Sequence, residues 1–204
     1  MSKNIRADRS WVELSPEMYP MARPIFQNLG HHLLIEALMA GNIAGKLYVD
    51  RSEDAQAGLL VYHQRMCLAG DAALPGFNAS LRRYFHETYI PPRLEAGWEA
   101  FALYCSPDDW LEALPPIFAP YRVIRLSHQY YELTYPDPAP AIHLPAGFEI
   151  QRITPAFLSS GVEGLEDIYD EMCSEPSSVD EFMAKSFGFV LVHENRAAGF
   201  CMSE

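Results

Sequence analysis

Carboxylates gather in one stretch of the chain, and they are the residues best placed to do chemistry. Between residues 163 and 181 there is no Lys or Arg, but there are eight acidic residues: Glu163, Glu166, Asp167, Asp170, Glu171, Glu175, Asp180 and Glu181. Such a cluster attracts cations, and an amine is one candidate. The plainer interpretation is a solvated helix face.

Histidines and cysteines, the usual metal ligands, do not occur in metal-binding patterns. His31 and His32 are adjacent on a predicted helix, so their side chains point about 100° apart and cannot chelate one metal from one face. We expect one to be half-buried and the other solvated. Cys67, Cys105 and Cys201 lie in apolar strand-like runs and are expected in the core. The sequence predicts no metal site, and it leaves the catalytic residues unknown.

A glycine-containing loop is the remaining place where a cofactor phosphate could bind. The stretch LAGDAALPGFNASL places Gly70 and Gly76 six residues apart, without an arginine and without a close pair of glycines. Asp71 would also repel an anion. We therefore expect an ordinary strand-to-helix loop here and assign no cofactor-binding residue.

The elements that must position these residues follow from the apolar periodicity. Helices are predicted from Ser15-Pro16 to about residue 38, over 77–89 with an end at Pro91-Pro92, and after the cap at 106–109. Strands are predicted at 46–50, 58–62, 65–69, 100–105 and 121–134, the last with a bulge near 128–130.

A proline-rich segment divides the chain. Four prolines occur in residues 136–145, which predicts an extended connector over 136–146 between a module at 1–135 and a second segment at 147–204. The second segment predicts a strand at 148–151, a short helix after Thr154, an acidic helix over 163–174, a capping box at Ser178, and two strands in 187–204. Tyr169 is expected on the buried stripe of the acidic helix. The fold class is α/β, with a mixed sheet of the α+β kind.

Residues 187–192 are apolar on both faces of the predicted strand, so we expect it inside a covered sheet. Either the first module covers this strand or the polypeptide continues beyond Glu204, and we favour the second explanation. An uncovered edge here also predicts self-association through the C-terminal sheet edge.

The second segment resembles the opening half of a GNAT-superfamily N-acetyltransferase domain. The resemblance rests on its order of strand, helix, helix, strand, strand, on LPAGFEIQRIT at its head, and on SSVDEFMAKSFGFVLVHENRAAGFCMS at its tail. Upstream, GNIAGKLYVD and AGLLVYHQRMCLAG resemble the N-terminal module of a bacterial two-module GNAT subfamily. The resemblance implies acyltransferase activity, with an acetyl group moving from acetyl-CoA to an amine in a V-shaped opening between two parallel strands. It also implies a Gly-rich loop that holds the pyrophosphate.

The cofactor half of that pattern is missing from this sequence, so we expect an incomplete domain that is inactive as this chain. The alternative is a non-catalytic GNAT-like module that binds a partner. The acceptor would be a small-molecule or peptide amine. In a GNAT domain the loop between the two helices borders the acceptor site, so the resemblance implies that Glu171 or Glu175 could attract this amine.

The charge balance disfavours some classes of binding partner. Fifteen Lys and Arg against 27 Asp and Glu give a net charge of −12, which disfavours nucleic acid and anionic lipid. No apolar run approaches the roughly 20 residues that cross a bilayer, and the N-terminus lacks the apolar part of a secretory signal. The sequence predicts a cytoplasmic protein.

Overall fold

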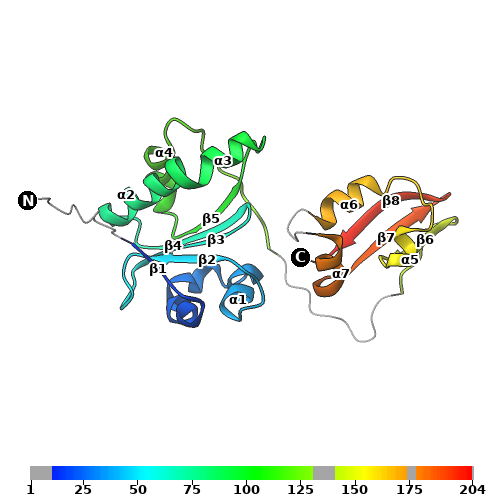
Figure 1. Ribbon diagram of the computed structural model, residues 1–204, viewed down its shortest axis with the longest axis horizontal. Coiled ribbons are helices and arrows are strands. Elements are labelled where there is room, and N and C mark those ends of the chain that lie inside the picture. Colours follow the sequence, from blue (N-terminus) through cyan, green and yellow to red (C-terminus); the bar gives the residue numbers. More distant parts are fainter. Residues whose placement is uncertain (1–10, 131–140, 174–177, 204) are drawn as a thin grey trace, which may run out of the picture. The chain divides into compact units, whose positions relative to one another are not determined.

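The computed structural model describes residues 11–130, 141–173 and 178–203. The chain divides into two compact units, Met1–Tyr131 and Glu132–Glu204, and each combines helices with a β-sheet (Figure 1). The predicted mixed α/β fold class is confirmed.

The first unit is built on a five-stranded sheet in the order β1-β2-β3-β4-β5. The first four strands pair antiparallel and β5 pairs parallel with β4, so the sheet is mixed. The strands are β1 (Val12–Glu13), β2 (Lys46–Val49), β3 (Ala57–Tyr62), β4 (Arg65–Gly70) and β5 (Ala102–Ser106). Four of them are confirmed predictions, whereas the two-residue β1 was not predicted.

Helices cover both faces of this sheet (Figure 1). On one face lie η1 (Pro16–Leu29) and α1 (Leu33–Met39), and on the other α2 (Pro75–Arg83), η2 (Tyr84–Tyr89), α3 (Ile90–Glu95) and α4 (Trp110–Phe118). Alternate residues of one strand enter different cores: Leu59 packs with Trp110, while Leu60 packs with Phe26. Burial on both sides explains why these strands are apolar throughout.

The predicted helix end at Pro91-Pro92 is wrong. The Ile90 N–H donates to the Phe85 carbonyl, a step of five residues, and the chain continues as α3. This π-type turn is wider than an α-turn. Both prolines lie in the first turn of α3, where a missing N–H costs no helical hydrogen bond.

The predicted strand at 121–134 is also wrong in its described part. Residues 121–130 form no strand or helix, and all of them are exposed, including Ile124 at 61% and Leu126 at 74%. The change of parity near His128 offers no single apolar face for a sheet to bury, and β5 pairs only with β4 among the described strands. Residues 131–134, and 136–140 of the predicted connector, lie outside the described residues.

The second unit has a three-stranded antiparallel sheet in the order β6-β7-β8. Its strands are β6 (Phe148–Arg152), β7 (Gly188–His193) and β8 (Arg196–Met202), and its helices are α5 (Pro155–Leu158), α6 (Glu166–Met172) and α7 (Val179–Lys185). The predicted helix starts are confirmed: Thr154 Oγ1 accepts from the Phe157 N–H at 3.1 Å, and Ser178 Oγ from the Glu181 N–H at 3.2 Å.

One face of this sheet is packed and the other is open. Val190 and Val192 point into the core with the helices, whereas Phe189 and Ile150 on the opposite face are 41% and 46% exposed. β7 is the middle strand of this sheet. The predicted covered sheet is not found within this unit, because no described element of the unit covers the second face of β7. Searching the described residues for a helix long and apolar enough to cross a membrane finds none.

Candidate functional site

The loop between β4 and α2 is the place where the resemblance would put a phosphate. Gly70 ends β4 with φ +92°, and a Cβ atom there would collide with the Gln56 carbonyl oxygen. The Gly70 carbonyl in turn accepts from Trp110 Nε1 at 3.1 Å. The loop therefore begins in a backbone conformation that neighbouring residues hold in place.

Two of its backbone amides are already engaged. Asp71 Oδ1 accepts from the Ala73 N–H at 2.8 Å, and the Asp71 N–H donates to the Gln56 carbonyl at 2.8 Å. Pro75, in the first turn of α2, has no N–H to offer. A phosphate-binding nest needs free N–H groups. Here the Asp71 carboxylate already occupies the place that a phosphate oxygen would take at the Ala73 N–H. These residues do not fit the pyrophosphate of acetyl-CoA.

A buried side-chain amide oxygen adds a second partial negative charge near this loop. Asn78 Nδ2 donates to the Ala72 carbonyl at 2.8 Å, but Asn78 Oδ1 is buried without a hydrogen-bond partner among the described residues. An unsatisfied acceptor favours a donor, not an anion. Together with the Asp71 carboxylate, it makes this loop a poor anion site.

The two parallel strands beside the loop stay paired along their length. The β4–β5 register runs without interruption from Arg65 opposite Ala102 to Ala69 opposite Ser106. The resemblance implies a V-shaped opening between two such strands. In the first unit, this pair is closed.

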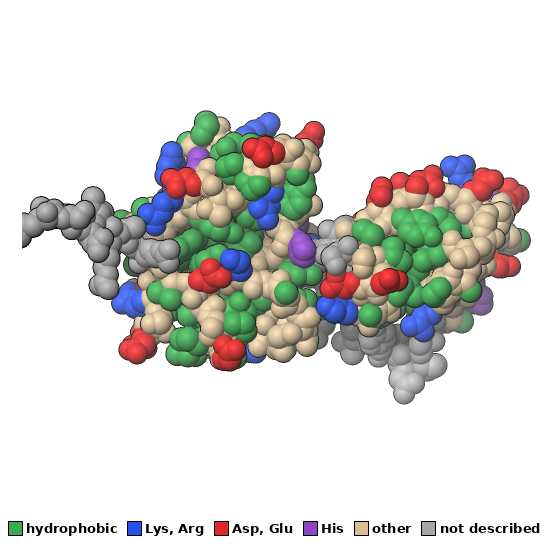
Figure 2. Space-filling model, viewed as in Figure 1, with side chains coloured by type: hydrophobic (Ala, Val, Ile, Leu, Met, Phe, Trp, Pro, Cys, Tyr) green, Lys and Arg blue, Asp and Glu red, His purple; other side chains and the backbone are tan. Residues whose placement is uncertain are grey.

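The acidic segment lies on α6 and the residues after it. Glu171 is exposed in the last turn of α6, and no ion pair or hydrogen bond of its side chain occurs among the described residues. Figure 2 shows acidic side chains along the rim of the second unit over α6. Glu175 lies outside the described residues, so the structure neither joins it to Glu171 nor separates them.

Tyr169 is not on the buried stripe that was predicted for it. Its side chain is 37% exposed, and its hydroxyl donates to the Leu158 carbonyl at 3.3 Å. Ile168 and Met172, from the same prediction, are fully buried. The phenol therefore ties α6 to α5 from the outside.

The thiols divide by environment. Burial raises the pKa of Cys67 to about 12, so this thiol stays protonated and unreactive near neutral pH. Burial, and to a smaller extent Asp108, also raises the pKa of Cys105. Cys201 is exposed, so the prediction that it belongs to the core is wrong: it lies on β8, on the open face of the sheet.

A cluster of imidazole and phenol rings in the first unit escaped sequence reasoning. The His32 ring lies 4.1 Å from that of Tyr104 and 5.0 Å from that of Tyr130, and His31 and His128 complete the cluster. As predicted, His31 is exposed and His32 is half-buried. Burial, with smaller effects from His31 and His128, lowers the pKa of His32 to about 4. No sequence signal joins residues this far apart.

A search of the described residues for three or more His, Cys, Asp or Glu side chains able to hold a metal ion finds no such group.

Comparisons with known proteins agree on one family. A family model described as GNAT acetyltransferase matches residues 23–204. An uncharacterized N-acetyltransferase, YdfB of Bacillus subtilis (strain 168), is 22% identical over 194 residues, which span 94% of this chain and 70% of that protein. A crystal structure of a GCN5-related N-acetyltransferase-like protein from Streptococcus suis 89/1591 superposes with a TM-score of 0.57 at 16% identity, covering 92% of this chain and 70% of that one.

The solved structure supports the fold, and the family match extends over both units. This chain belongs to the GNAT acetyltransferase family.

Proposed function

We propose that the protein acetylates an amine that is guided to the site by carboxylates at the end of α6, with acetyl-CoA as the donor. Membership of the family supports acetyl transfer in general. In this reaction the neutral amine nitrogen attacks the thioester carbonyl, an N–C bond forms, and the C–S bond breaks. The coenzyme leaves as its thiol after taking up the proton that the nitrogen loses.

The position of Glu171 is the observation that supports an amine as the acceptor substrate. A carboxylate in the last turn of a helix faces the negative end of the helix dipole, which costs a few tenths of a kcal/mol. No cation among the described residues compensates Glu171, so its position does not serve stability. An exposed, uncompensated carboxylate attracts an ammonium group.

Kinetics on a panel of primary amines tests this proposal. Glu171→Gln should raise KM for the amine about three- to tenfold with little change in kcat, because the carboxylate attracts the substrate without taking part in the chemistry. Glu166→Gln, at the other end of the same helix, is the matched control and should leave KM unchanged. An equal KM for both variants would contradict the role of Glu171. The absence of any acetylated amine would contradict the function of this chain and would favour the expectation that its domain is incomplete and inactive.

We also propose that the first unit is a non-catalytic GNAT-like module. Three observations support this. The Asp71 carboxylate already accepts from the Ala73 N–H, Pro75 has no N–H to donate, and β4 and β5 are paired along their length. Saturating acetyl-CoA should leave the NMR signals of the Asp71 and Ala73 amides unshifted. Shifts at these amides that disappear on Gly76→Asp substitution would overturn the proposal, since they would place the pyrophosphate in this loop.

A further inference from the structure

A hollow of about 400 Å³ opens on the first unit between η1 and the loop that joins β2 to β3. This volume is in the range of small-molecule sites. Its floor is apolar and buried, formed by Leu14, Ala22 and Val49. Ser52 and Asp54, from the loop, stand at its exposed rim. The hollow thus combines an apolar floor with one charged group.

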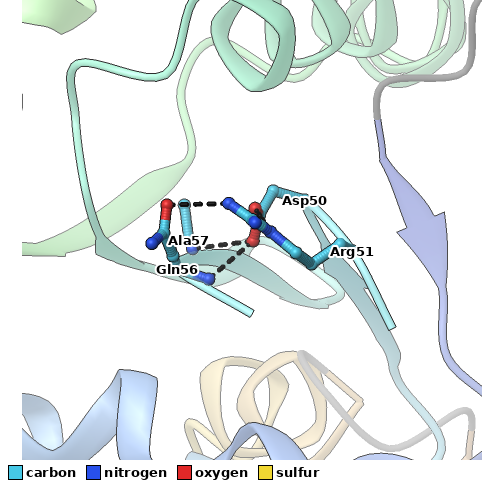
Figure 3. Close-up of polar contacts among 4 residues, drawn as sticks. All are labelled: Asp50, Arg51, Gln56 and Ala57. Atoms are coloured by element: carbon cyan, nitrogen blue, oxygen red, sulfur yellow. Dashed lines mark hydrogen bonds and ion pairs between the residues drawn. The ribbon is translucent and has the colours of Figure 1, made fainter. Parts of the chain in front are cut away.

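The loop that forms one wall of the hollow is held at its two ends by the carboxylate of Asp50 (Figure 3). Asp50 Oδ1 accepts from the backbone N–H groups of Gln56 and Ala57 at 2.7 and 3.1 Å. Arg51 Nε donates to Asp50 Oδ2 at 2.7 Å, and Arg51 Nη2 donates to Gln56 Oε1 at 2.7 Å. Burial alone would raise the pKa of Asp50, but these hydrogen bonds outweigh it and lower the pKa. A wall fixed in advance loses little entropy when a ligand binds.

The charge in the hollow is uncompensated. Asp54 is the ionisable residue of the lining, and it has no ion pair or hydrogen bond with any residue in the described part of the chain. Two arginines close to the lining residues are engaged elsewhere. Arg51, three residues before Asp54, is bound to Asp50, and Arg23, between the lining residues Ala22 and Pro24, pairs with Glu36. A ligand with a cationic group could therefore pair with the Asp54 carboxylate while its apolar part covers the floor of the hollow.

We propose that this hollow binds a small free amine with an apolar body. The ammonium group pairs with the Asp54 carboxylate and donates to the Ser52 hydroxyl, while the carbon chain covers Leu14 and Val49. This site is in the first unit, is distinct from the acceptor residues of the second unit, and does not depend on the proposed function. With one exposed ion pair and a shallow floor, the affinity should be on the order of millimolar.

Titration of the 204-residue chain with n-hexylamine, followed by NMR of the backbone amides, tests the proposal. The amides of Met21, Ala22, Ile25 and residues 52–55 should shift with saturation. Hexanol, which keeps the chain and lacks the charge, should bind about threefold more weakly, and hexanoate should not bind, since it carries the charge of Asp54. Equal binding of hexylamine and hexanoate, or shifts confined to other residues, would overturn the proposal.

A pair of variants distinguishes the effect of the Asp54 charge on binding from a change in the conformation of the loop. Asp54→Asn should weaken hexylamine about threefold and leave hexanol unchanged. Because Asn, like Asp, tolerates the positive φ of 50° found at this residue, the loop keeps its conformation. Glu53→Gln removes a neighbouring exposed charge that does not line the hollow and should change nothing. An equal loss in both variants would show only an effect of net charge and would contradict the site.

Discussion

At the scale of single residues, His32 links packing to pH. Its imidazole contacts the rings of Tyr104 and Tyr130 and lies beside His31. Because its pKa falls to about 4 in the folded protein, the unfolded chain, with a pKa near 6.5, binds the proton more readily. The stability contributed by neutral His32 is therefore complete above about pH 6.5 and is lost as the pH falls towards 4.

We expect His32→Gln to flatten the fall in unfolding free energy between pH 6.5 and 4 by about 1–2 kcal/mol, a value reduced for partial exposure. Urea denaturation at a series of pH values measures this slope. His31→Gln is the control, because that ring is exposed, and it should keep most of the wild-type slope. A slope unchanged by the His32 substitution would contradict the contribution of this ring.

Gly70 makes a second prediction at this scale. Substitution by Ala brings a Cβ atom against the Gln56 carbonyl in addition to the strain of a positive φ, so we expect a loss of about 3 kcal/mol. Gly41→Ala separates the two effects. Gly41 has φ +74° with open space around it, and its loss should be about 1 kcal/mol. Chemical denaturation of both variants gives the difference, and equal losses would argue against the collision.

The sequence alone shows the charge and polarity of a residue, but not its hydrogen bonds or the face of the sheet on which it lies. The charge of Asp71 is visible in the sequence, and it argues against a phosphate. Its bond to the Ala73 amide is not, since that requires the backbone path of the loop. Cys201 was misplaced because an apolar strand has two faces, and the sequence does not tell which face is covered.

At the scale of elements, β7 and β8 should differ in protection. β7 pairs on both sides, with β6 and β8, while the outer edge of β8 has no strand neighbour among the described residues. At the start of this edge the Ala197 N–H donates to the Glu163 carbonyl at 2.9 Å. We therefore expect slow amide hydrogen exchange in β7 and fast exchange at those β8 amides beyond Ala197 that point away from β7. Hydrogen exchange followed by NMR resolves the two sets. Uniformly slow exchange in β8 would mean that another segment or chain covers its edge.

Local patterns predicted most elements, and long-range geometry decided the exceptions. The hairpin of β7 and β8 could be predicted because Glu194 and Asn195 interrupt two apolar runs, and both have the positive φ that a tight hairpin turn requires. The continuation of the helix through Pro91 and Pro92 could not, because a π-turn depends on how Phe85 and Tyr89 pack. Residues 121–130 read as a strand by composition, yet a strand also needs a partner.

At the scale of the whole molecule, charge and exposed edges oppose each other. The net charge of −12 keeps copies apart, while the β8 edge and the open face beside it favour pairing between copies. Salt screens repulsion between surface charges over about 10 Å at 0.1 M and about 3 Å at 1 M. Association through β8 should therefore strengthen as salt is added, contrary to what attraction between opposite charges would give.

Sedimentation velocity at low and high salt measures this association, and Ala198→Pro tests where it occurs. The register shift opposite Leu191 and Val192 leaves Ala198 without a partner on β7, and a proline is tolerated at such a bulge while it blunts an edge strand for pairing. We expect this variant to remain monomeric at high salt, whereas Ala198→Ser, the matched control, should associate like the wild type. If the proline variant associates as strongly as the control, copies meet through another surface, and Phe189→Lys would then ask whether it is the open face of the same sheet.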